Sequence, residues 1–98
     1  MSIKATRKIA IHPGEILQDY ISDYKLNQSE LARRLRVPTG NINEICRGKR
    51  GISSEMALKL SKFFRTTPDL WAGLQKNWEL SQIDQSIIDD ISPIKLRA

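Results

Sequence analysis

The residues with the clearest capacity for chemistry lie between Pro38 and Arg50. Small polar and basic side chains follow one another there, interrupted at helical spacing by Ile42, Ile45 and Cys46. Asparagine and threonine are indifferent helix formers, so their concentration on the outer side of a helix indicates a binding role. Their amide and hydroxyl groups match the donors and acceptors on base edges in the DNA major groove. The candidate base-contacting residues are Thr39, Gly40, Asn41, Asn43, Glu44 and Arg47, with Gly40 permitting close approach of the backbone.

Basic residues cluster around this polar segment. Between Arg33 and Arg50 there are six basic residues and one acid, Glu44, and the resulting +5 equals the net charge of the whole chain. Gln28 at the start of the preceding helix, and Lys49 and Arg50 just past the polar helix, are candidates for phosphate contacts, which fix register without reading sequence. The structural alternatives are a solvated turn at residues 49–50 and a capping loop at residues 39–41.

Five helices with short connections would position these residues. Caps and first-turn prolines predict helix starts at Pro13, after Asn27, after Pro38, at Ser53 or Ser54, and at Pro68. The first helix is expected to bury Ile16, Leu17, Tyr20, Ile21 and Tyr24, and the fifth to turn Leu70, Trp71, Leu74 and Trp78 inward. No segment alternates with a period of two for long enough to form a strand. The predicted fold class is therefore all-α.

The second and third of these helices form the pattern of a helix-turn-helix. Both are short, only "RVPT" separates them, and the second of the pair begins with small polar residues. The prediction is one DNA-binding domain at residues 12–80, preceded by a flexible N-terminal arm at residues 1–11 and followed by a tail at residues 81–98. Isoleucines at helical spacing in the tail predict a short sixth helix ending at Asp90 or Ile91, and a loose tail is the alternative.

Composition argues against an enzyme, a membrane protein or a secreted protein. The chain has 98 residues, one histidine and one cysteine, and its adjacent carboxylates Asp89 and Asp90 would point about 100° apart on a helix. His12, beside Pro13 at a helix entry, is expected to be structural, and Cys46 is expected to lie in the core. With no disulfide framework, membrane-length apolar run or signal peptide, we expect a cytoplasmic protein without a catalytic residue, metal or cofactor.

Several motifs extend the pattern beyond the two short helices. The stretch "LNQSELARRLRVPTGNINEICRGKRGIS" resembles the helix-turn-helix of the phage-repressor-like (Cro/C1 or Xre) class. The flanking "HPGEIL", "ISSEMALKLSKFF" and "TTPDLWAGLQ" are similar to the HigA antitoxins, also called virulence-associated protein I. The resemblance covers residues 12–80. Pro38, Gly40 and the Ala72-Gly73 pair depart from the pattern, which bears on the base sequence read and not on the DNA-binding role.

The resemblance implies a specific function. HigA proteins are antitoxins of type II toxin–antitoxin pairs, which neutralise a small RelE-like (HigB) toxin that cleaves messenger RNA and, as dimers, repress their own operon. It places Gln28 at a phosphate-contacting position and Thr39, Gly40, Asn41 and Glu44 at base-reading positions. A stand-alone regulator without a toxin would share these motifs, and a toxin gene adjacent to this one would separate the two hypotheses. A protein-interaction module is the weaker alternative, because it leaves the basic cluster unexplained.

Two further surfaces are expected from the same reasoning. One recognition helix contacts too few base pairs for operator specificity, so we expect a homodimer on a palindromic operator, paired through Trp78, Leu80, Ile83 and Ile87. A toxin must bind away from the DNA-reading helix, and the first helix carries an acidic stripe, Glu15, Asp19 and Asp23, at intervals of four residues. A solvated helix face is the alternative for this stripe. The acidic tail from Glu79 to Asp90 is the other candidate toxin surface, but it is already assigned to dimerisation.

Overall fold

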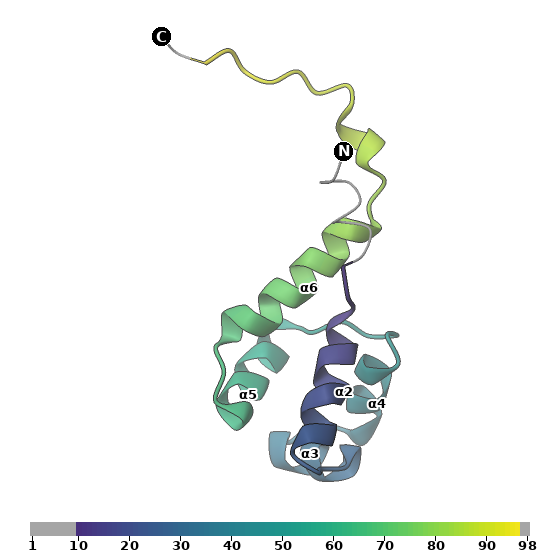
Figure 1. The fold of residues 1–98 in the computed structure, drawn as a ribbon, viewed down its shortest axis with the longest axis vertical. Coiled ribbons are helices and arrows are strands. Elements are labelled where there is room, and N and C mark those ends of the chain that lie inside the picture. The colour runs from purple at the N-terminus through teal and green to yellow at the C-terminus, as the bar shows by residue number, and fades with distance from the viewer. Residues whose placement is uncertain (1–9, 97–98) are drawn as a thin grey trace.

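The computed structural model describes residues 10–96 and shows an all-α fold, as predicted. Within residues 10–96, five α-helices and one short 3₁₀-helix follow one another (Figure 1). Their bounds are α2 Pro13–Asp23, α3 Gln28–Leu35, α4 Thr39–Cys46, α5 Ser54–Phe64, α6 Pro68–Gln82 and η1 Gln85–Ile88. The predicted N-terminal arm, residues 1–11, lies outside the described residues except for its last two.

Helix starts follow from local capping chemistry. The side chains of Asn27, Ser53 and Thr67 accept hydrogen bonds from backbone N–H groups in the first turns of α3, α5 and α6. His12 caps α2, because its Nδ1 accepts the N–H of Gly14 at 2.9 Å. Side-chain caps satisfy N–H groups that have no partner within the helix, so the sequence fixes these four starts locally.

The core lies where the five described α-helices converge. Its largest fully buried side chain is Trp71 of α6, which packs near Tyr20 and Phe64 with ring centroids 5.2 and 6.3 Å away. The indole Nε1 donates to Thr66 Oγ1 at 2.8 Å, so the buried polar atom of Trp71 is satisfied. Trp71 was expected in the core and is there.

Close approach of α2 to α4 depends on a glycine. A Cβ atom at Gly14 would meet the backbone carbonyl of Ile45, so no larger residue fits without separating the two helices. This contact explains the glycine of "HPGEIL". It holds α4 against the first helix, with Ile42 and Ile45 turned into the core.

Three expectations about burial were wrong or incomplete. Tyr24 is exposed, because α2 ends at Asp23 and Tyr24 lies in its C-terminal turn, where its ring stacks along that of Tyr20 at 6.4 Å. Leu70 is also exposed, since it lies in the first turn of α6. Cys46 is only partly buried at the edge of the core. Helical periodicity placed these side chains on an apolar stripe, but it does not show which part of the stripe other elements cover.

The chain continues beyond the bundle as a narrow extension. The C-terminal half of α6 projects from the other helices, and the tail extends further away, which gives the molecule its 55 Å longest dimension (Figure 1). The predicted sixth helix is reduced to η1, a single 3₁₀ turn capped by Asp84, and residues 91–96 are extended and exposed. The four residues of η1 bury no side chain, so no packing stabilises a longer α-helix at this place.

Candidate nucleic-acid interface

The α3–α4 pair has the arrangement of a helix-turn-helix. Arg36 ends α3 in a left-handed conformation with φ of 61°, and the N–H of Val37 returns to the carbonyl of Ala32 at 3.0 Å. Pro38 then leads directly into α4. The sharp turn allows two eight-residue helices to pack against each other while the outer side of α4 remains exposed.

The predicted base-contacting residues lie along α4 and at its C-terminal cap. Thr39, Gly40, Glu44 and Arg47 are exposed, whereas Asn41 and Asn43 are half-buried. Around Gly40, an added Cβ would meet no atom within 4 Å, so the space in front of this backbone is open. Five of the six predicted residues thus lie in α4 and the sixth, Arg47, at its C-cap, whereas Ile42 and Ile45 of the same helix are core.

The N-terminus of α4 has no side-chain cap. Pro38 occupies the cap position and has neither an N–H nor a polar side chain, and no side chain accepts from the first-turn N–H groups. The N–H of Asn41 returns only to the carbonyl of Pro38, at 3.0 Å. An uncapped helix start carries partial positive charge and free donors, which suit an anionic ligand such as a phosphate.

Gln28 is fixed against α4. The side-chain Nδ2 of Asn43 donates to Gln28 Oε1 at 3.2 Å across the helix pair. The amide nitrogen of Gln28 has no partner in the described part of the chain and remains available as a donor. Asn43 therefore positions Gln28, a pairing between residues 15 positions apart that the sequence pattern does not show.

Glu44 and Arg50 form an ion pair beside the exposed face of α4. The Nε and Nη2 atoms of Arg50 both lie 2.8 Å from Glu44 Oε1, and each side chain remains about half exposed. Two other basic residues of this region, Arg47 and Lys49, form no ion pair with another described residue. The pair holds Arg50 over α4 and neutralises the one acid in this basic region, so Glu44 has a partner within the chain that was not anticipated.

Gln75 of α6 fixes the loop that carries the basic residues. Its Oε1 accepts the N–H of Ile52 at 2.7 Å, and its Nε2 donates to Glu79 Oε2 at 2.8 Å. This hydrogen bond and another from Lys76 lower the pKa of the exposed Glu79 carboxyl. Sequence reasoning missed the role of Gln75, because only the fold brings it beside Gly51 and Ile52, more than 20 positions away.

The other predicted surfaces lie elsewhere on the molecule. Glu15, Asp19 and Asp23 are exposed on α2, and none of them forms an ion pair with another described residue. Of the predicted dimer contacts, Trp78 is half-buried with its ring 4.7 Å from that of His12, whereas Leu80, Ile83 and Ile87 are exposed. Part of Trp78 is thus already used within the chain.

Titratable groups near the core have structural explanations. Desolvation lowers the pKa of His12, against a smaller opposing effect of Glu15, and this favours the neutral ring that accepts from Gly14. Burial raises the pKa of the Cys46 thiol, which disfavours the reactive thiolate. Among residues 10–96 no group of three histidine, cysteine or acidic side chains is placed to hold a metal, and no helix there is long and apolar enough to cross a membrane.

Comparison with known proteins decides the family. The helix-turn-helix model HTH_3 matches residues 20–71, more than half of the chain and the whole of the α3–α4 pair. This chain belongs to the helix-turn-helix family. A curated relative, the virulence-associated protein A' of Dichelobacter nodosus, is 38% identical over 81 residues, which cover 82% of this chain and 70% of the relative.

Two solved structures are similar to this helix-turn-helix chain over most of its length. An addiction module antidote protein of the HigA family from Coxiella burnetii has a TM-score of 0.81 and 36% identity, covering 87% of this chain and 98% of that one. The antitoxin HigA of Pseudomonas aeruginosa, solved with the higBA promoter, has a TM-score of 0.81 and 34% identity, covering 88% and 99% of the two chains. The predicted resemblance to HigA antitoxins and the predicted fold are both confirmed.

Proposed function

We propose that the chain is the DNA-binding antitoxin of a type II toxin–antitoxin pair. In this role it represses its own operon as a homodimer and neutralises a RelE-like toxin. The observation that carries the proposal is the first turn of α4, which is polar, exposed at Thr39 and Gly40, and uncapped, whereas the other described α-helices are capped. The similar HigA of P. aeruginosa, solved with its promoter, supports it.

The first turn of α4 is proposed to read bases. Thr39 and Asn41 supply donors and acceptors for base edges, and the open space at Gly40 allows the backbone to approach the groove floor. Arg47 and the Glu44–Arg50 pair lie further along the same face. Because Arg50 occupies one oxygen of Glu44, the remaining carboxylate oxygen is the acceptor left for a base.

Phosphates are proposed to bind around this turn. The side chain of Gln28 is held against α4 by Asn43, which leaves its amide nitrogen as a donor for a phosphate. Lys49 and Arg50 follow α4 in a loop that Gln75 fixes. Rigid donors lose little conformational entropy on binding, so these contacts would set the register of α4 on the duplex.

Self-association and toxin binding complete the proposal. Two copies would place their recognition helices in half-sites about one helical turn apart on a palindrome, paired through the region of Trp78, Leu80, Ile83 and Ile87. The toxin would bind the exposed stripe of Glu15, Asp19 and Asp23, because unpaired carboxylates attract a basic RNA-cleaving partner.

DNA binding is tested by the salt dependence of affinity. Lys49→Ala should lower affinity for any duplex and reduce the slope of log K against log salt by about one. Lys76→Ala removes the same charge from α6, where the lysine pairs with Glu79, and should leave the slope unchanged. An unchanged slope for Lys49→Ala would contradict the phosphate role.

Toxin neutralisation is tested by rescue of growth. The adjacent toxin gene, if present, is expressed with the antitoxin carrying Asp19→Lys and Asp23→Lys, and repression of the operon is measured in parallel. Lost rescue with intact repression supports the α2 stripe. Full rescue, together with failure of an Asp89→Lys, Asp90→Lys variant, would move the site to the tail, and the absence of any toxin gene would favour a stand-alone regulator.

A further inference from the structure

A basic groove with an apolar floor lies between the C-terminal end of α3 and the outer side of α5. We call it the α3–α5 groove, and it has a volume of about 400 Å³. Four cations rim it: Arg34, Arg36, Lys59 and Lys62. Its floor is formed by Leu35, Leu58 and Phe63. The proposed DNA-binding and toxin-binding residues do not line it.

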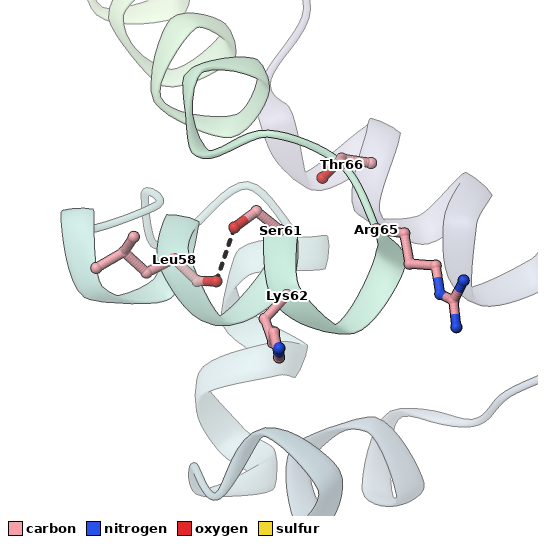
Figure 2. Close-up of a pocket in the computed structure, with 5 residues that line it drawn as sticks. All are labelled: Leu58, Ser61, Lys62, Arg65 and Thr66. Atoms are coloured by element: carbon pink, nitrogen blue, oxygen red, sulfur yellow. Dashed lines mark hydrogen bonds between the residues drawn. The ribbon is translucent and has the colours of Figure 1, made fainter.

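The floor of the groove is open to solvent. Leu58 is 60% exposed in the middle of α5, although the opposite side of that helix is core. The guanidinium of Arg34 lies 5.0 Å from the centre of the Phe63 ring, which keeps that cation at the rim. A second hollow shares Leu58 and Lys62 and continues to Arg65, so the surface follows α5 to its C-terminal end (Figure 2).

The charge of the groove is largely uncompensated. Among its four rim cations only Lys59 has an acidic partner in the described part of the chain, Glu55 at 3.4 Å, and that carboxylate is itself well exposed. A partner for this surface should therefore be acidic and should carry large aliphatic side chains. A basic toxin would be repelled by it.

The tail of the same chain has this complementary chemistry. Between Asp84 and Ile91 there are three acids, Asp84, Asp89 and Asp90, and no base. Ile87, Ile88 and Ile91 in the same segment are 65%, 55% and 68% exposed. The tail extends away from the helical bundle (Figure 1), and no tail residue lines the α3–α5 groove of its own chain.

We propose that the acidic segment Asp84–Ile91 of one copy docks in the α3–α5 groove of a second copy, and that the contact is reciprocal. The proposal deepens the homodimer of the proposed function and rests on it. Isoleucines of the segment would cover Leu58 and Phe63 while Asp89 and Asp90 meet the rim cations. A symmetric exchange makes this contact twice and closes the assembly at two copies. Nucleic acid would satisfy the cations but would leave the apolar floor without a partner.

Charge reversal and its rescue test the docking. Lys62→Glu and Asp89→Lys should each weaken the dimer roughly tenfold in sedimentation equilibrium at low salt, because each puts like charges together. Combining the two changes in one chain should restore most of the affinity. Leu58→Gln, at an exposed position, should weaken the dimer while the far-UV circular dichroism of the chain at working temperature stays that of the folded protein. Lys25→Glu makes the same charge change at an exposed position outside the groove and should leave the dimer affinity unchanged.

The outcomes separate this proposal from the function it rests on. A stable dimer whose affinity none of the groove and tail variants changes would overturn the docking and leave dimerisation in place. A monomer of 11.2 kDa at micromolar concentration would overturn both the docking and the homodimer. This holds also if the tail of the monomer occupies the groove of its own chain. If Lys62→Glu leaves the dimer intact but weakens binding to random-sequence duplex, the groove takes nucleic acid and the proposal is wrong.

Discussion

The N-terminus of α4 differs from those of the other four described α-helices. His12, Asn27, Ser53 and Thr67 each provide a side-chain cap, whereas α4 begins at Pro38 with none. Caps typically contribute about 0.5–2 kcal/mol, so the sequence leaves available stability unused at this one helix. The helix N-termini with no proposed ligand are thus capped by side chains, and the N-terminus at which a ligand is proposed to bind is uncapped.

Two helical glycines show the same contrast. Gly14 is packed against the carbonyl of Ile45, whereas nothing lies within reach of a Cβ at Gly40. The first glycine serves the contact between α2 and α4. No described residue packs against the second glycine, so the space beside it is open to the close approach of an external ligand.

Replacing these glycines should give opposite changes in stability, and this is the largest effect we expect. Gly14→Ala should lower the free energy of unfolding by roughly 1–3 kcal/mol, because the new methyl group forces α2 from α4. Gly40→Ala should raise it by about 0.5–1 kcal/mol, because alanine favours the helix and meets no neighbour. Urea denaturation of both variants measures the difference, and equal destabilisation would contradict the structural distinction.

Removing the side-chain cap of α5 should destabilise the fold, whereas a substitution in the uncapped first turn of α4 should not. Ser53→Ala should cost about 1 kcal/mol in the free energy of unfolding, because the N–H of Met56 loses its acceptor. Thr39→Ala, in the first turn of the uncapped helix, should change stability by less than about 0.5 kcal/mol. If Thr39→Ala proves as destabilising as Ser53→Ala, Thr39 has a structural role within α4.

Acidification should produce the smallest effect, through the histidine cap. The pKa of His12 is lowered from 6.5 in the folded protein, so the unfolded chain binds the proton more readily. Its contribution to stability is therefore complete above the unfolded pKa and is lost as pH falls through 6.5 towards the folded value. We expect a lower melting temperature at about pH 5.5 than at about pH 7.5. His12→Asn retains a capping side chain and should reduce this difference, and an unchanged difference would assign it to other groups.

The sequence predicted most of the fold because its signals are local. Asn27, Thr67 and the prolines mark helix starts within one turn, and Gly48 follows α4 with φ of +75°, as expected of a residue past a helix end. The tail was less predictable, since its isoleucines have helical spacing but are left exposed by the helices of their own chain. Periodicity indicates an apolar face and does not show whether another element covers it.

The membership of the candidate site stays a prediction from residue types, whereas its internal contacts could not be predicted from the sequence. The structure places Thr39 at an exposed position of α4 and Asn41 at a half-buried one. The Gln28–Asn43 and Glu44–Arg50 pairs and the contact of Gln75 with Ile52 depend on how helices and loops come together. Such contacts follow from tertiary packing, which leaves no trace in the local pattern.

The most direct test of the account is a binding titration of Thr39→Ala and Asn41→Ala on two duplexes, the operator upstream of the gene and a scrambled sequence of equal length. We expect each variant to lose about 1–3 kcal/mol of binding free energy on the operator and almost none on the scrambled duplex. Lys49→Ala should lose affinity for both. Equal losses on the two duplexes for Thr39→Ala and Asn41→Ala would contradict the claim that the open end of α4 reads DNA sequence.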